Sequence, residues 1–215
     1  MRIFVTGATG YLGAELCRRL AGRGYRVTAL VRPGSEARVP EGCEAVTGDA
    51  LNASSYAGNI PGCACFIHLV GTPRPAPWKA RQFRQFDLPA TLEAIKAAQQ
   101  AGAAHFVYVS VAQPAPLMHA YISVRRQCEK ALEESGLNVT ILRPWYVLGP
   151  GRRWPYLLKP FYWVAEKSRS WRAAAQRLGM VTRDQMLRAL IWSVEHPGSG
   201  VQMLEVPQIR RGHRF

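Results

Sequence analysis

The chain has 215 residues, with 28 Lys and Arg against 14 Asp and Glu and a formal net charge of +14. Its hydrophobic fraction of 48% supports one sizeable core, which excludes an intrinsically disordered chain and predicts a single domain. A positive field attracts anionic cofactors, lipid or nucleic acid. No basic run is interleaved with stacking aromatics and no zinc-finger spacing is present, so we expect no nucleic-acid partner.

Apolar runs and helical spacings alternate along the first two thirds of the chain. Short apolar runs predict strands at residues 2–7, 25–32, 43–49, 65–70, 105–110 and 138–144. Helical spacing predicts helices at residues 11–24, 79–101 and 119–135, with a weaker one at 54–58. Strands that alternate with helices and are buried on both faces predict an α/β fold: a doubly wound parallel sheet with helices on both faces.

The first expected strand leads into the stretch TGATGYLG. Glycines at this spacing allow a tight turn, bring backbone N–H groups close to a pyrophosphate, and let a helix start against the sheet. Ligands of such folds bind beyond the carboxyl ends of the strands. We therefore predict a phosphate-binding loop made by Gly7, Ala8, Thr9, Gly10, Tyr11, Leu12 and Gly13.

Arg32 closes the second expected strand, and no carboxylate follows it before Glu36. An acid at this place accepts a hydrogen bond from the ribose 2′-OH of NAD, whereas an arginine accommodates the 2′-phosphate of NADP. A charge-assisted contact contributes about 1.5 to 3 kcal/mol. We therefore expect NADP(H) as the cofactor in preference to NAD(H).

Six motifs together resemble the extended and atypical short-chain dehydrogenase/reductases: VTGATGYLG, LVRPGS, VTGDALN, FVYVS, Tyr-x-x-x-Arg and LRPWYVLGPG. The resemblance is strongest to the branch related to the NADPH-binding accessory subunit of respiratory complex I. It covers residues 1–151 and is thin beyond them. It implies a Rossmann core at residues 1–150 and a C-terminal substrate-lid region at residues 151–215 that completes the same domain. It also implies further cofactor contacts at Asp49, Ala50, Leu69, Val70, Gly71, Pro144, Trp145, Tyr146 and Val147.

The resemblance implies a catalytic Ser or Thr, Tyr and Lys, and this chain alters that set. Tyr121 is kept, Arg125 stands where the lysine belongs, and Val111 follows Ser110 where relatives have a second serine. Tyr121 and Arg125 should lie on one helical face, where they also border the cofactor. Arg125 still favours a phenolate but cannot release a proton. Ser110 replaces the missing hydroxyl only through a one-residue shift, which would turn its side chain away.

Two functions remain open. One is an NADP(H)-dependent reductase of a small or hydrophobic carbonyl compound, with Tyr121 as acid and base. The other is a non-catalytic NADP(H)-binding redox sensor, or an assembly or membrane-associated factor. The partner is a small-molecule substrate or none, and the chain is a monomer or a homodimer.

Residues 149–179 mix aromatic with basic side chains. This composition suits core packing with a solvated basic face, a lid over a hydrophobic substrate, or an interfacial segment on an anionic membrane. Pro155 and Pro160 break any long helix and favour the lid.

The remaining polar residues of note are expected to be structural. Cys63, Cys65 and His68 lack a fourth ligand and the usual spacing, so we expect a buried strand and no metal site. Arg143 is expected to be a structural ion-pair or cap residue and not a catalytic one. Scattered cysteines predict reduced thiols, and the sequence shows neither a signal peptide nor a run of 18 apolar residues. We therefore expect a cytoplasmic protein.

Overall fold

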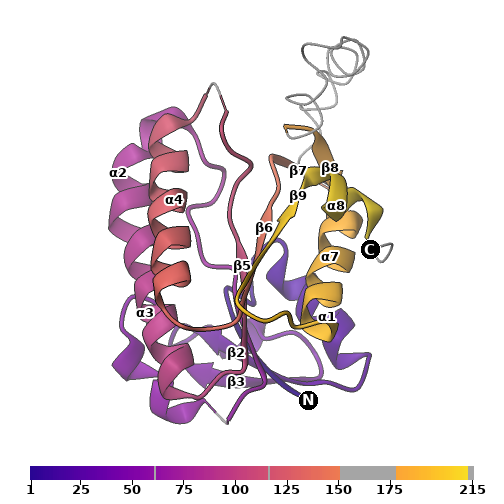
Figure 1. Cartoon of the computed structure of the whole chain (residues 1–215). Helices are drawn as coiled ribbons and strands as arrows, with labels where there is room; N and C mark the ends of the chain where they lie inside the picture. The colour runs from indigo at the N-terminus through magenta and orange to yellow at the C-terminus, as the bar shows by residue number, and fades with distance from the viewer. Residues whose placement is uncertain (61, 116, 151–177, 213–215) are drawn as a thin grey trace.

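The computed structural model describes residues 1–60, 62–115, 117–150 and 178–212. Within these residues, seven parallel strands form one sheet in the order β3-β2-β1-β4-β5-β6-β9 (Figure 1). The strands are β1 Arg2–Thr6, β2 Arg26–Val31, β3 Cys43–Thr47, β4 Cys65–His68, β5 His105–Val109, β6 Val139–Arg143 and β9 Val201–Glu205. A separate parallel pair joins β7 Tyr146–Leu148 to β8 Met180–Thr182. The predicted doubly wound parallel sheet is confirmed.

Helices cover both faces of the sheet. One face carries α1 Gly13–Ala21, α7 Arg183–Glu195 and α8 Val206–Arg211, and the other carries α3 Leu88–Gln100 and α4 His119–Glu134 (Figure 1). Short helical turns fill several connections: η1 Glu36–Arg38, η2 Ala53–Ser55, η3 Ala57–Asn59 and η4 Pro77–Lys79. No helix in the described ranges is long and apolar enough to cross a membrane.

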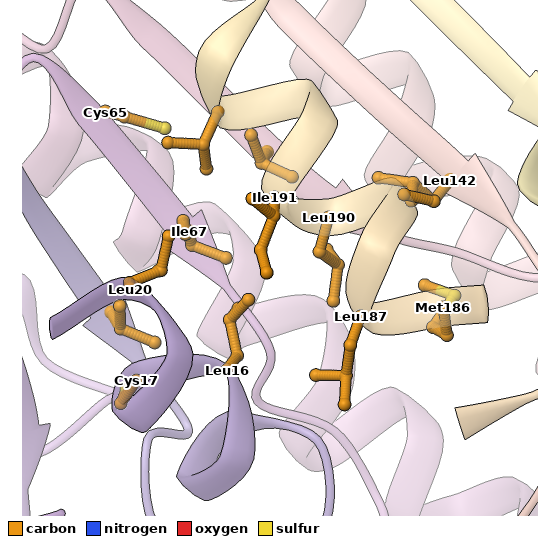
Figure 2. Packing of buried hydrophobic residues seen from close by; sticks show 14 of the residues in the cluster. Leu16, Cys17, Leu20, Cys65, Ile67, Leu142, Met186, Leu187, Leu190 and Ile191 are labelled. Carbon is orange, nitrogen blue, oxygen red and sulfur yellow. The ribbon is translucent and has the colours of Figure 1, made fainter. Parts of the chain in front are cut away.

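The core on the α1 side is aliphatic. Leu16 and Leu20 of α1 are one turn apart, so they share a face, and they point toward Leu190 and Ile191 of α7 (Figure 2). Ile67 of β4 lies beneath both helices and is also fully buried. Helix α7 is therefore part of the central packing.

The opposite face of the sheet is aromatic. Phe4, Phe66 and Phe106 occupy paired positions on the neighbouring strands β1, β4 and β5. Their ring centroids lie 5.1 and 5.2 Å apart along this row. Such ring pairs stabilise a sheet beyond the area they bury, and they set the register in which β4 lies beside β1.

The end of the chain adds a strand that the sequence did not predict. We expected six strands, with residues 151–215 completing the same domain, and β9 adds a seventh strand beside β6 while α7 and α8 cover the sheet. Strand β9 lies at the edge of the sheet, and only Leu204 in it is buried. A strand with one buried residue gives only a weak pattern of apolar residues in the sequence. The core thus extends through residues 178–212. The expected lid at residues 151–177 lies outside the described residues.

The helix expected at residues 79–101 is built from successive pieces. After η4 come α2 Ala80–Gln82, the π-helical turn η5 Phe83–Asp87, and α3. Pro89 lies in the first turn of α3 and has no N–H, so the regular hydrogen-bond ladder is interrupted there. Phe83 and Asp87 of this turn are both buried in the protein interior.

The place of α7 in the core can be tested with Leu190→Ala. This side chain is fully buried, so its truncation should lower the free energy of unfolding by about 2 to 5 kcal/mol in urea titrations. Leu92→Ala is the control, because Leu92 is 38% exposed and its loss should cost less than about 1 kcal/mol. Equal effects of the two substitutions would show that α7 does not pack as described.

Candidate dinucleotide-binding site

The loop after β1 runs against the loop after β4. Gly7 has a positive φ of 76°, and a Cβ built on it would lie 2.8 Å from the carbonyl carbon of Leu69. A Cβ on Gly13 would collide with the carbonyl oxygen of Gly7. The turn is closed by a 3.0 Å hydrogen bond from the Gly10 amide to that same oxygen. Only glycine fits at positions 7 and 13, as the predicted phosphate loop requires.

The start of α1 offers amide donors to an anion. Leu12 receives no side-chain cap, and within the described residues the Leu12 and Gly13 amides donate to no acceptor. Unpaired N–H groups at a helix N-terminus carry partial positive charge and attract phosphate. The predicted loop residues Ala8, Thr9 and Tyr11 lie in this same turn.

Tyr11 is covered by residues from the end of the chain that the sequence did not suggest. The Arg183 guanidinium carbon lies 4.8 Å from the centroid of the Tyr11 ring. A Cβ on Gly149 would collide with the Tyr11 hydroxyl. The glycine-rich loop is therefore braced by β7 and α7.

The order of the sheet places this loop at the point where the chain reverses direction. β2 and β3 lie on one side of β1, whereas β4, β5, β6 and β9 lie on the other. In open α/β sheets, ligands bind in the crevice beyond this point. Leu69 and Val70 follow β4 directly and are half-buried, and their backbone lies beside Gly7 of the loop after β1.

Arg32 and Asp49 stand at the carboxyl ends of the neighbouring strands β2 and β3. Arg32 is exposed, and its side chain has no hydrogen bond or ion pair within the described residues. Asp49 is also exposed and accepts a 2.9 Å hydrogen bond from the Leu51 amide, which fixes its carboxylate beside the half-buried Ala50. Arg32 is therefore available to an anion at this edge.

Tyr121 and Arg125 share one face of α4, as expected. The Arg125 guanidinium carbon lies 5.1 Å from the Tyr121 ring centroid. Tyr121 is half-buried, and its ring also packs on Phe83 at 4.9 Å. The cation contacts the ring face of Tyr121, and the structure gives no bond from Arg125 to the phenol oxygen.

Arg125 is buried and forms several hydrogen bonds. Its Nη2 donates to Oδ2 of Asp87 at 3.1 Å, and its Nη1 donates to the Tyr108 hydroxyl at 2.7 Å and to the Val109 carbonyl at 3.2 Å. Burial opposes its charge, but Tyr108, Tyr121 and Asp87 hold the pKa of Arg125 well above its usual value. Arg125 is therefore a fixed cation.

The same network anchors the loop after β4. Oδ1 of Asp87 accepts hydrogen bonds from the Thr72 amide at 2.7 Å and the Thr72 hydroxyl at 2.6 Å. A Cβ on Gly71 would collide with the Arg125 guanidinium. Sequence reasoning missed Asp87. The one available signal was that no other carboxylate stands between Asp49 and Glu93.

Ser110 and Val111 are both buried just after β5. The Ser110 amide donates to the Leu142 carbonyl at 2.8 Å, and its hydroxyl has no partner within the described residues. Val111 is 3% exposed and supplies no hydroxyl. A buried hydroxyl without a partner is unfavourable, so Ser110 can offer a hydrogen bond to a ligand.

The segment after β6 forms the far end of the same edge. Pro144 is buried, and its carbonyl accepts a 3.0 Å hydrogen bond from the Ala112 amide. Trp145 and Tyr146 are half-buried and meet edge to face at 5.5 Å, and Val147 is also half-buried. Burial raises the pKa of Tyr146. These residues follow β6 at the carboxyl edge of the sheet, and their contact with the nicotinamide stays a prediction.

Two other polar residues are structural, as expected. Arg143 donates to Glu129 at 2.7 Å and to Glu205 at 3.0 Å, which joins α4 to β6 and β9. His68 is fully buried and shares a 2.7 Å hydrogen bond with Thr6. Burial lowers the pKa of His68 to about 3, so the ring stays neutral in the core.

A parallel sheet with a glycine-rich turn at its switch point and amide donors at the first helix is a Rossmann fold, the arrangement that binds dinucleotides. Residues 7–153 match the family model described as NAD(P)H-binding, and the chain belongs to this family. Its cofactor class is therefore a nicotinamide dinucleotide.

Known proteins similar to this chain include enzymes and an assembly factor. A ceramide reductase of Caulobacter vibrioides (strain NA1000 / CB15N) is 31% identical over 69% of this chain and 47% of its own length. The photosystem II assembly factor Ycf39 of Guillardia theta is 31% identical over 65% of this chain and 45% of its own. The chain thus spans about half the length of these curated relatives.

A solved structure supports the fold. The UDP-N-acetylglucosamine 4-epimerase from Bacillus cereus superposes with a TM-score of 0.71 at 18% sequence identity, over 95% of this chain and 79% of that one. At this level of identity the likeness concerns the fold alone.

The buried ion pair can be tested with Asp87→Asn, which keeps the shape of the side chain and removes its charge. Arg125 would then be a buried charge without a counterion, so the free energy of unfolding should fall by about 3 to 5 kcal/mol. Asp184→Asn is the control, because its ion pair with Arg19 is exposed and contributes about 1 kcal/mol or less. Urea titrations that give the same small loss for both variants would contradict the network.

Proposed function

We propose that this chain binds NADP(H) and reduces a small or hydrophobic carbonyl compound, or oxidises the corresponding alcohol in reverse. The observation that carries the proposal is the glycine-rich turn at the start of α1, where the Leu12 and Gly13 amides have no acceptor among the described residues and can bind phosphate. The similarity to a relative named as a ceramide reductase supports reduction as the reaction class.

The choice of NADP(H) over NAD(H) is supported by Arg32. This guanidinium is exposed at the carboxyl end of β2 and has no partner in the described ranges, so it is free to bind a 2′-phosphate. We assign the adenine side to Asp49 and Ala50, the path between the two loops to Leu69, Val70 and Gly71, and the nicotinamide side to Pro144, Trp145, Tyr146 and Val147.

In the proposed reaction, Tyr121 gives a proton to the substrate oxygen, and NADPH, when bound, supplies the hydride. Arg125 keeps a fixed positive charge against the face of the Tyr121 ring and holds that ring in place. Because Asp87 and Tyr108 hold this guanidinium and it cannot release a proton, Arg125 does not take part in a proton relay. The hydroxyl of Ser110 is the group we assign to hold the substrate oxygen.

A second function is favoured by the altered catalytic set. Val111 supplies no hydroxyl, and Arg125 is committed to a buried ion pair, so the chain could bind NADP(H) without turnover. In that case the bound cofactor would stabilise a surface for another protein. The similarity to a relative named as an assembly factor supports this candidate.

Cofactor choice can be tested with Arg32→Ala. NADPH should raise the melting temperature of the wild type more than NADH does. The variant should bind NADPH about 10 to 150 times more weakly, with NADH binding unchanged. Arg26→Ala is the matched control, because Arg26 is exposed at the opposite end of the same strand. Equal stabilisation of the wild type by NADPH and NADH would contradict the preference for NADP(H).

The role of the phenol can be tested with Tyr121→Phe, which keeps the ring that packs on Phe83 and Arg125. NADPH oxidation is measured with a panel of aldehydes, ketones and quinones. Turnover should fall by about 10²- to 10⁴-fold while NADPH binding is retained. Unchanged turnover would rule out Tyr121 as the acid. Binding of NADPH by the wild type with no turnover across the panel would favour the second function.

A further inference from the structure

The connection between β4 and α3 presents large apolar side chains to solvent. Trp78 is 84% exposed and Phe86 is 50% exposed, and both belong to residues 72–87, which we call the 72–87 segment. Leu117, in the loop just before α4, is 65% exposed. Helix η4, which contains Trp78, packs beside α4. Large apolar side chains gathered on one surface mark an interaction site more often than single exposed ones do.

The 72–87 segment is held firmly at its base. Asp87 accepts two hydrogen bonds from Thr72, at 2.7 and 2.6 Å, and also binds Arg125 of α4. Phe83 is fully buried and packs on Tyr121. Contacts that hold both ends of a loop restrict its motion. Trp78 and Phe86 are therefore exposed in the native structure itself.

The outer part of the segment is also ordered by its own chain. The Lys79 ammonium donates to the Pro73 carbonyl at 2.7 Å. Pro75 and Pro77 restrict the backbone between these two residues, because the proline ring fixes φ. Trp78 therefore lies on a turn whose backbone conformation is restricted.

The charge on this surface has one sign. The segment contains four basic residues, of which Arg74, Arg81 and Arg84 are exposed. Its single carboxylate is Asp87, which is buried and paired with Arg125. The chain has no other carboxylate between Asp49 and Glu93. The solvent-facing side of the segment is thus apolar and cationic.

We propose that the 72–87 segment, together with Leu117, docks on the surface of an anionic lipid bilayer. Trp and Phe side chains lie well at the boundary of headgroups and acyl chains, and nearby Arg and Lys residues are attracted to anionic headgroups. A second copy of the chain fits less well, because a twofold contact through this surface would bring Arg81 and Arg84 close to the same cations of the other copy.

Nucleic acid also fits this surface less well than an anionic bilayer does. Single strands bind where bases stack on aromatic rings along a basic groove. The exposed side chains here include the aliphatic Leu117, which offers no stacking face.

The segment begins at the carboxyl edge of β4, the edge that carries the glycine-rich turn, so a docked protein would turn this edge toward the lipid.

The test is sedimentation of the full chain with phosphatidylcholine vesicles and with vesicles that also contain phosphatidylserine. The wild type should pellet with the phosphatidylserine vesicles and be released by salt. Arg81→Glu with Arg84→Glu should weaken binding by at least about tenfold, because each cation near an anionic surface is attracted to it. Trp78→Ser with Phe86→Ser should also weaken binding, even at low salt.

Matched controls separate the segment from the general charge of the protein. Arg2→Glu with Arg26→Glu makes the same change in net charge at exposed positions near the amino ends of β1 and β2. Leu51→Ser removes a different exposed apolar side chain. Both should leave vesicle binding within about twofold of the wild type, and circular dichroism should show that every variant is folded.

Three outcomes would overturn the proposal. The wild type could fail to pellet with phosphatidylserine vesicles. The control variants could lose binding as much as the segment variants do, which would reflect net charge alone. Trp78→Ser with Phe86→Ser could retain vesicle binding yet abolish a dimer or an oligonucleotide complex, which would assign the surface to that partner. The experiment needs no cofactor or substrate, so its result is independent of the proposed enzymatic function.

Discussion

The close approach of the loops after β1 and β4 is the constraint on which the site depends. Gly7 lies so near the Leu69 backbone that no side chain fits between them, and Gly13 lets α1 begin immediately after the turn. These two glycines direct the amides of Leu12 and Gly13 to the edge where the strand order reverses. An anion at this edge would meet backbone donors and the helix dipole together, which is the physical basis of pyrophosphate binding.

A second constraint comes from one buried ion pair. Asp87 binds both Thr72 of the loop after β4 and Arg125 of α4, so it connects the cofactor edge to the helix that carries Tyr121. This geometry suits arginine, whose guanidinium contacts Asp87, Tyr108 and the Val109 carbonyl at once. Arg125 therefore joins two parts of the site and remains a cation beside the Tyr121 ring.

The sequence predicted the parts of the fold that depend on local pattern. The first six strands, the glycine-rich turn and the shared face of Tyr121 and Arg125 are confirmed. Strand β9 was missed because its edge position leaves only Leu204 buried. The role of Asp87 could not be read from the sequence, because its partners Thr72 and Arg125 lie on other elements and meet it only in the folded chain. Local sequence pattern does not show which residues from distant parts of the chain will contact one another.

The account rests on phosphate binding at the start of α1, and calorimetry tests this directly. Titration of NADPH into the folded wild-type protein should give a saturable heat with one site per chain, and Gly13→Val should abolish that heat, because its side chain would collide with the Gly7 carbonyl. The variant must show the circular dichroism spectrum of the wild type. If folded wild-type protein gives no heat with NADPH or NADH, the dinucleotide site does not exist.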